Sequence, residues 1–358
     1  MTGPAHATQK YLVVCLAALL LLAPGCDNTQ ATALPARVQA ATTFINPLLP
    51  SGPDPWVVQK DTTYYYTNTF GNRIAIAATN KMSELSNASF TTIWMPPLTG
   101  MYAKQIWAPE MHHINNKWYV YFAADDGNNA NHRIYALECN DADPIKGEWT
   151  FKGKIADTQN DKWAIDASVF EYQNQLYMAW SGWPDTANTQ QVLYIARMKD
   201  PLTLEGRRVM ISAPEYEWEK AGAPPAVNEG PQALFNKNGK LFLTFSASGC
   251  WTDSYSLGLL SLKDNSDPMN PAHWTKSPSP LFTTAAANNA YAPGHNGFFT
   301  SRDGKQNWMI YHANSNSGDG CGNKRSPRMQ RFTWKADGTP DFGVPVKTGV
   351  PVRKPGGE

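Results

Sequence analysis

The chain has 358 residues, a formal net charge of +1 and only 17% charged residues. This charge balance excludes net charge as a basis for binding nucleic acid or an anionic surface. The chain contains 13 Trp, 15 Tyr and 14 Phe, together with 26 Gly and 27 Pro, which is typical of a turn-rich β protein. An aromatic excess also suits sugar binding, because the C–H faces of sugars pack on rings, although we expect most of these side chains in the core.

The N-terminus has the pattern of a bacterial export signal. The stretch "KYLVVCLAALLLLAPGC" supplies one Lys, then an apolar run that is too short to span a membrane, and then small residues. We predict a signal peptide over residues 1–26 and a linker without periodicity over residues 27–46. The residues before Cys26 resemble a lipoprotein signal with Pro24 as an extra residue, so lipid anchoring at Cys26 and simple secretion both stay open.

The cysteines agree with export. Outside the signal peptide the chain has Cys139, Cys250 and Cys321, and an exported protein permits one disulfide and one free thiol. Their spacing does not decide which two are paired. No C-x-x-C motif or His/Cys cluster argues for zinc.

Five segments of the chain share one design, in which an apolar strand and a short polar turn precede an aromatic-rich strand. They are "DPWVVQKDTTYYYTN", "APEMHHINNKWYVYFAA", "DASVFEYQNQLYMAWSG", "EGPQALFNKNGKLFLTFSAS" and "GHNGFFTSRDGKQNWMIYHA". The turns "NN", "QN", "KNG" and "RDGK" are hairpin signals. The second strands, marked by Tyr64, Trp118, Leu176, Leu241 and Trp308, follow one another at intervals of 54, 58, 65 and 67 residues.

Each interval leaves room for two further strands, such as "HRIYALE" and "QVLYIARM". The sequence therefore predicts an all-β fold, a five-bladed β-propeller with four antiparallel strands per blade, over residues 47–352. A two-sheet sandwich is the alternative, but it does not explain the regular repeat.

In a propeller, the innermost strand of each blade runs along the central channel and begins at one end of it. Near that point the five units carry ionisable residues, which we predict to converge on a shared pocket: Asp54, Glu110, Asp166, Glu229 and His295. A single carboxylate at a strand start is ordinarily a turn cap. Five such positions in one repeat favour a functional site.

Clustered carboxylates suit general acid/base catalysis, because crowding raises the pKa of at least one of them. Hydrolysis of a glycoside needs such a pair, and in an inverting enzyme the two groups lie about 6.5–9.5 Å apart. The same oxygens could instead bind a cation on the channel axis, calcium or another ion.

Three acidic motifs in this order resemble those of glycoside hydrolase family 43: "GPDPW", "IDASVF" and "NEGPQALF". "WAPEMHHINNKWYVYFAA" and "GHNGFF" are also similar to that family, so that the resemblance covers about residues 46–350. It implies an inverting mechanism on arabinofuranosides or xylosides, with no cofactor required. Asp54 would be the general base, Glu229 the general acid, and Asp166 the residue that orients the acid and adjusts its pKa. Glu110 has no catalytic role in the family pattern.

The resemblance also implies residues that bind substrate. His295 matches a histidine near the channel axis that holds a water or a metal beneath the sugar. In "NKRSPRMQRFTWKADGTP" the family arginine that reaches a sugar hydroxyl is matched by Arg325, with Arg328 as the second candidate. Trp107, just before "APE", is placed to stack on a sugar.

The run "SASGCWTDSYSLGLLSL" resembles arabinofuranosidase members. We expect an exported α-L-arabinofuranosidase that acts on arabinan or arabinoxylan polysaccharides or oligosaccharides, with a β-xylosidase or an endo-arabinanase as alternatives. A non-catalytic glycan-binding propeller is the alternative of another class. From their places in the fourth and fifth units, we predict that Cys250 and Cys321 pair and that Cys139 stays free.

Overall fold

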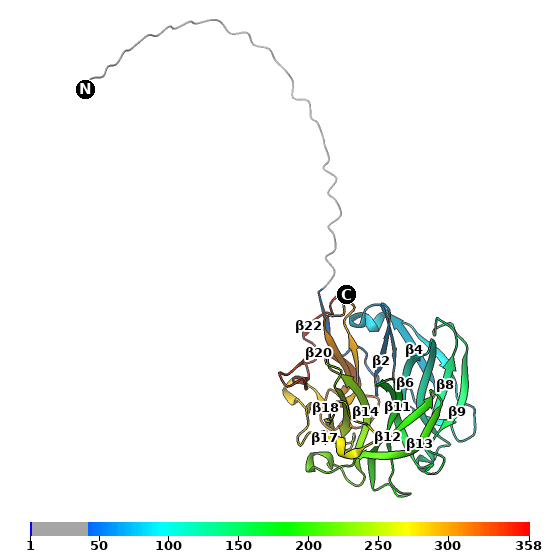
Figure 1. Cartoon of the computed structure of the whole chain (residues 1–358). Helices are drawn as coiled ribbons and strands as arrows, with labels where there is room; N and C mark the ends of the chain where they lie inside the picture. Colours follow the sequence, from blue (N-terminus) through cyan, green and yellow to red (C-terminus); the bar gives the residue numbers. More distant parts are fainter. Residues whose placement is uncertain (2–41) are drawn as a thin grey trace, which may run out of the picture. The chain divides into compact units, whose positions relative to one another are not determined.

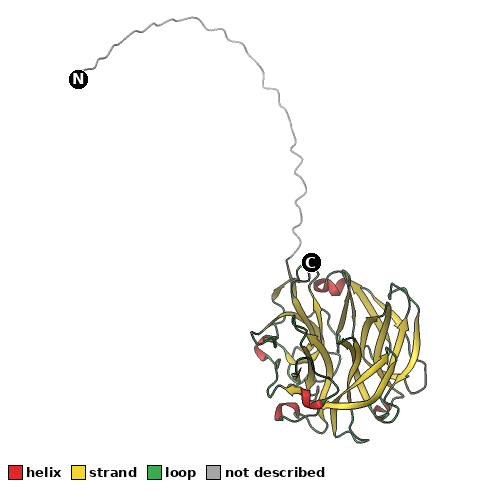
Figure 2. Ribbon diagram, in the orientation of Figure 1, coloured by secondary structure: helices red, strands yellow, loops and turns green. Residues whose placement is uncertain are grey.

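The computed structural model describes residue 1 and residues 42–358. The predicted signal peptide and Cys26 lie outside this part of the chain, as does the linker up to residue 41. In the described part β-strand dominates, and the helices are short 3-10 turns (Figure 2). They are η1 (Met82–Asn87), η2 (Asn129–Asn131), η3 (Glu217–Glu219), η4 (Pro271–His273) and η5 (Ala286–Asn288). None of the described helices has the length and apolar character needed to cross a membrane.

Antiparallel strands follow one another in five runs of four, in chain order (Figure 1). The first two runs are β2 (Trp56–Lys60), β3 (Thr63–Thr67), β4 (Ile74–Thr79) and β5 (Phe90–Trp94), then β6 (Lys104–Ile114), β7 (Lys117–Asp125), β8 (Arg133–Cys139) and β9 (Trp149–Ile155). The third run is β10 (Ala164–Tyr172), β11 (Gln175–Gly182), β12 (Gln190–Asp200) and β13 (Thr203–Ser212). The fourth and fifth are β14 (Ala226–Phe235), β15 (Leu241–Ala247), β16 (Ser256–Leu262) and β17 (Trp274–Lys276), then β18 (Tyr291–Thr300), β19 (Asn307–Asn314), β20 (Ser326–Trp334) and β21 (Pro340–Asp341).

The third and fourth runs are joined into one eight-stranded sheet by a short parallel contact. There Gln190 and Gln191 of β12 pair with Ala226 and Val227 of β14. The other three runs are separate four-stranded sheets.

Tight turns produce the first hairpin of these runs. Asn115 and Asn116 between β6 and β7 have φ values of 51° and 62°, and Gln173 and Asn174 between β10 and β11 have φ values of 51° and 61°. Two consecutive left-handed residues give the turn whose twist matches that of paired strands, which is why "NN" and "QN" are hairpin signals.

The first strands of the five runs contact one another in a closed ring, in the order β2, β6, β10, β14, β18 and back to β2. The hydrophobic core is divided in the same way, because each of five large clusters of buried side chains is shared by two neighbouring runs. The cluster between the last and first runs contains Trp308 and Ile310 of β19 with Tyr64 and Tyr66 of β3. Every run is therefore covered on both faces.

The segment before the first run also helps to join the last run to the first. Residues 43–45, which we expected within the linker, form β1 (Thr43–Ile45) and pair with β22 (Pro351–Arg353). The Asn46 side chain donates to the Met329 carbonyl at 2.9 Å and accepts from the Met329 N–H at 3.0 Å. The side-chain amide of Asn46 thus forms with β20 the same pair of hydrogen bonds that the backbone of a paired strand would form.

We call the packed contact between the last and first runs the seam. Its contribution to stability can be tested with Trp308→Ala. Trp308 is 2% exposed in the cluster that joins β19 to β3, and removing a buried Trp from a core costs about 3–5 kcal/mol. We expect a loss of this size in the free energy of unfolding, measured by chemical denaturation. Phe235→Ala, at a side chain that is 39% exposed, is the control and should cost much less. Equal losses in the two variants would contradict the role of the seam.

Candidate active site

Asp54 lies immediately before β2, where the chain enters the first run, and its carboxylate is buried. Its Oδ2 accepts a hydrogen bond from Thr69 Oγ1 at 2.7 Å, and its Oδ1 accepts one from Arg325 Nη1 at 2.9 Å. The Asp54 N–H donates to Nδ1 of His312 at 3.0 Å. That nitrogen of His312 is therefore unprotonated, in agreement with burial, which lowers the pKa of the ring well below its usual range.

The charge of Asp54 is decided by its neighbours. Burial alone would raise the pKa of this carboxyl, but the positive charges of Arg325 and His295 outweigh burial and hold the pKa well below its ordinary range. Asp54 is consequently ionised at neutral pH and carries the charge that a general base requires.

Asp166, near the start of β10, is in the opposite situation. It is 3% exposed, and burial together with the charges of Glu229 and Asp54 raises its pKa to about 7. Its Oδ2 accepts the N–H of Gly230 at 3.0 Å. Asp166 is thus bonded to the residue that directly follows Glu229.

Glu229 lies near the start of β14 and is half-buried. Its Oε1 accepts a hydrogen bond from the Tyr255 hydroxyl at 2.7 Å. Burial raises the pKa of Glu229 even though the Tyr255 bond acts in the other direction. One site thus holds an ionised carboxylate, Asp54, and two carboxyls that retain a proton more readily than usual.

A backbone feature repeats at the start of all five first strands. In each case one residue at the mouth of the ring has a left-handed φ, which side chains rarely adopt: Asp54 (55°), Ala108 (42°), Asp166 (57°), Gly230 (54°) and His295 (46°). β6 and β18 each have a second left-handed residue three positions earlier, Gln105 (49°) and Ala292 (50°). In β6, β10, β14 and β18 the strand register shifts across the residue at the mouth, as in a β-bulge. The bulge turns the chain at the mouth of the ring, so that side chains at or beside it face one cavity.

This repeat corrects the predicted alignment of the five ionisable residues. Asp54, Asp166 and His295 occupy equivalent positions, but Glu110 lies two residues after the left-handed position and Glu229 lies one residue before it. Glu110 is 2% exposed and accepts hydrogen bonds from Gln232 Nε2 and, at 3.2 Å, from Nε2 of His112. It links β6 to β14 below the mouth and does not line the cavity.

The cavity at the mouth has a volume of about 360 Å³. Its wall includes the three acids and three of the four residues that we predicted to bind substrate, namely Trp107, His295 and Arg325. The indole of Trp107 stacks on the ring of His132, with ring centroids 4.0 Å apart. Nδ1 of the buried His132 lies 3.0 Å from Asp125 Oδ2, so Trp107 rests on a fixed support.

Arg328 was the second arginine candidate, and the structure does not bring it to the cavity. Its side chain is fully buried, and its guanidinium donates to the carbonyl oxygens of Asn289 at 2.8 Å and Asn314 at 3.0 Å and to Ser315 Oγ at 3.1 Å. It supports the loop after β19. Arg325, three residues earlier, is the one that reaches Asp54.

His295 lies among the three acids of the cavity. The Nδ1 of its ring lies 3.4 Å from Asp54 Oδ1, and its backbone N–H donates to Ser246 Oγ at 2.7 Å. Burial would lower its pKa, but the three surrounding carboxylates raise the pKa above its usual value.

Donor atoms of Asp166, Glu229 and His295 lie within 4.8 Å of one another. Calcium prefers six to eight oxygen ligands, whereas one of these three donors is a nitrogen. These three residues alone therefore do not complete a calcium site, and calcium or another ion on the channel axis stays a prediction.

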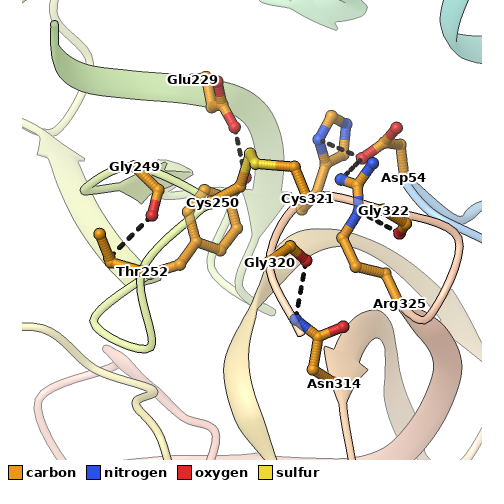
Figure 3. Close-up of a disulfide and its surroundings, with 12 residues drawn as sticks. Asp54, Glu229, Gly249, Cys250, Thr252, Asn314, Gly320, Cys321, Gly322 and Arg325 are labelled. Atoms are coloured by element: carbon orange, nitrogen blue, oxygen red, sulfur yellow. Dashed lines mark hydrogen bonds and ion pairs between the residues drawn. A yellow bond between two sulfur atoms is a disulfide. The ribbon is translucent and has the colours of Figure 1, made fainter. Parts of the chain in front are cut away.

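A disulfide joins Cys250 and Cys321, as predicted, with the Cα atoms 5.1 Å apart. It lines the cavity, and Figure 3 shows it between Glu229 on one side and Asp54 with Arg325 on the other. Of the described cysteines, Cys139 is the one outside the disulfide, and it is buried.

Several residues of the site were missed from the sequence. Thr69 contacts Asp54 within the first run and Tyr255 contacts Glu229 within the fourth, whereas His312 of the fifth run contacts Asp54 of the first. His132 supports Trp107 within the second run. None of them lies in an acidic motif. The folding of single runs brings Thr69, Tyr255 and His132 to their partners, and closure of the ring brings His312 to Asp54.

Comparison with known proteins identifies relatives over nearly the whole chain. Residues 44–340 match the model of glycosyl hydrolases family 43. An extracellular exo-α-(1→5)-L-arabinofuranosidase of Streptomyces avermitilis is 41% identical over 97% of this chain and 72% of its own length. Alpha-L-arabinofuranosidase 43 of Humicola insolens is 38% identical over 89% of this chain and 67% of its own length.

Among solved structures, the fold resembles that of an α-L-arabinofuranosidase from Lactobacillus brevis. The TM-score is 0.80 and the sequence identity 37%, with 86% of this chain and 98% of that chain covered.

Removal of the disulfide should destabilise the fold. The two cysteines are 71 positions apart, and a cross-link over a loop of that length stabilises a protein by about 4 kcal/mol when chain entropy dominates. We expect the double variant Cys250→Ser/Cys321→Ser to lose up to about this amount of unfolding free energy. A reductant should reproduce the loss in the wild type and leave the double variant unchanged. Unchanged stability after verified reduction of the wild type would contradict this expectation.

Proposed function

Because the chain belongs to glycosyl hydrolase family 43, and is therefore a glycoside hydrolase, we propose that it releases L-arabinofuranose from arabinan- or arabinoxylan-type polysaccharides or oligosaccharides. The choice of sugar is supported by relatives at 38–41% identity that are named α-L-arabinofuranosidases. Two of them are named extracellular, which supports export of this chain as well. Whether Cys26 is lipidated stays a separate question.

We infer that the fold is the predicted five-bladed β-propeller, with each run of four antiparallel strands as one blade. Three observations support this inference: the five runs in chain order, the closed ring of first strands, and a core cluster between each pair of neighbouring runs. The parallel contact between β12 and β14 is then a bridge between two blades.

One observation supports the mechanism most strongly, namely that three acids at one cavity have pKa values displaced in opposite directions. Asp54, held ionised by Arg325 and His295, would act as the base that removes a proton from the attacking water. Glu229, whose pKa is raised by burial, would donate its proton to the glycosidic oxygen as the bond breaks. Water attack from the face opposite the leaving group inverts the anomeric carbon.

Asp166 would position and tune the acid. It holds the N–H of Gly230, next to Glu229, and its carboxyl lies close to that of Glu229. Two crowded carboxyls cannot both ionise freely, so that together they retain a proton that Glu229 can deliver. A purely glycan-binding protein would not need this opposition of charge states.

The roles of the two catalytic acids can be separated with two leaving groups. We expect Asp54→Asn to lower kcat by about 10²- to 10⁴-fold on both 4-nitrophenyl α-L-arabinofuranoside and α-1,5-arabinobiose. Glu229→Gln should lose that much on arabinobiose and less on the aryl substrate, because 4-nitrophenolate leaves without protonation. Glu171→Gln, at an exposed acid of β10, is the control. A wild type inactive on arabinofuranosides, xylosides and arabinan would refute the proposed function, and a fully active Asp54 or Glu229 variant would refute the assignment.

The pH dependence of kcat/KM should reflect the displaced pKa values. The low pKa of Asp54 keeps the base ionised in mildly acid solution, whereas Asp166, which tunes the acid, loses its proton as the pH rises through about 7, and the pKa of Glu229 is also raised. We therefore expect kcat/KM to fall above about pH 7.

Asp166→Asn removes a negative neighbour of Glu229, so the alkaline limb of the profile should move to lower pH. An unchanged or higher alkaline limb in this variant would contradict the proposed role of Asp166.

A further inference from the structure

The cavity wall contains a largely exposed aromatic side chain that the mechanism does not use. Trp251 is 45% exposed, whereas Trp163 in the same wall is 3% exposed and Trp107 is half-buried. Leaving so much of an indole in contact with solvent forgoes the stabilisation that burial would give. A cavity that binds a ligand recovers that stabilisation when the ligand covers the ring.

The indole of Trp251 is held in place by two glycines. A Cβ atom at Gly249 would lie 2.3 Å from Cε2 of Trp251, and one at Gly222 would lie 2.4 Å from its Nε1. The two backbones therefore approach the ring more closely than any other residue type allows. The Gly249 N–H donates to the Ala221 carbonyl at 2.9 Å, which fixes the two loops to each other.

The loop of Trp251 is also fastened across the cavity mouth. Its neighbour Cys250 forms the disulfide with Cys321. Asp253 of the same loop accepts hydrogen bonds from Ser317 Oγ and, at 3.0 Å, from the Gly318 N–H. The loop that follows β15 is thus joined twice to the loop that follows β19, once by the disulfide that Figure 3 shows and once through Asp253, so that Trp251 is a rigid part of the wall.

Trp251 belongs to the side of the cavity that carries Glu229. Ser246 pairs with Glu229 in the ladder between β14 and β15, and Tyr255 donates to the Glu229 carboxyl. Trp251 lies in the loop between these two partners of Glu229. Asp54 is approached instead by Arg325, from the loop after β19.

The side of the acid is the side of the leaving group, because an acid must lie beside the oxygen that it protonates. We propose that Trp251 is the stacking platform for the leaving sugar, the pentose ring on the acceptor side of the cleaved bond. The face of its indole packs on the C–H face of that ring. This inference rests on the proposed function, and it makes Trp251 a residue that determines preference for a sugar leaving group.

The test compares wild type, Trp251→Ala and Trp251→Phe. Loss of a central aromatic contact is worth more than 1 kcal/mol, so we expect kcat/KM on α-1,5-arabinobiose to fall about 10-fold in Trp251→Ala. Trp251→Phe should retain most of the activity. Methyl α-L-arabinofuranoside has no leaving ring, so its kcat/KM should be unchanged, and the inhibition constant of free L-arabinose should stay within about twofold.

Phe235→Ala, at an exposed aromatic outside the cavity, should match the wild type throughout. The inference is overturned if Trp251→Ala keeps the wild-type kcat/KM on arabinobiose, or if it loses as much on the methyl arabinofuranoside. It is also overturned if Trp251→Phe, folded by its thermal unfolding curve, loses as much as Trp251→Ala. A wild type without activity on any arabinofuranoside would instead refute the proposed function, so the two failures are distinct.

Discussion

The left-handed residue at the start of each first strand is the constraint on which the site depends. A strand of uniform register would send alternate side chains into the channel and would end without turning. Because the register shifts at Ala108, Asp166, Gly230 and His295, side chains from different runs meet at one mouth. Gly230 also shows how close this approach is, since a Cβ there would lie 3.3 Å from the ring of His295.

Because the three acids lie close together at one cavity, the groups around each acid determine its protonation state. Asp54 has a guanidinium within 2.9 Å and an imidazole within 3.4 Å, so its negative charge is stabilised. Burial and the charges of Glu229 and Asp54 raise the pKa of Asp166, and burial and the charge of Asp54 raise the pKa of Glu229, so both retain protons more readily. Residues of the same chemical type thus acquire opposite roles from position alone, without any difference in their own chemistry.

The sequence was a good guide to those features that a short segment of the chain determines by itself. Alternating strands, hairpin turns and the motifs around Asp54, Asp166 and Glu229 are contained in short segments, and they predicted both the strand order and the three acids. It was a poor guide to register, because one bulge displaces every later residue, and Glu110 was therefore aligned with residues that it does not match. Thr69 and Tyr255 lie in loops far along their runs from Asp54 and Glu229, and His312 comes from another run. Arg328 resembled a ligand although its guanidinium donates to backbone carbonyls and to Ser315. Such contacts depend on the three-dimensional fold and are not contained in any short motif.

The seam that closes the ring has a consequence for how the protein is made. Asn46 and Met329, which bond across it, are 283 positions apart, and contacts of such long sequence separation form slowly. Until the last run has been synthesised, Tyr64 and Tyr66 of the first run lack the cover that Trp308 later supplies. Asp54 and Arg325 come from the two sides of the same seam, so the paired base cannot exist before closure. A chain that still lacks its last run can therefore form most of its sheets without forming the active site.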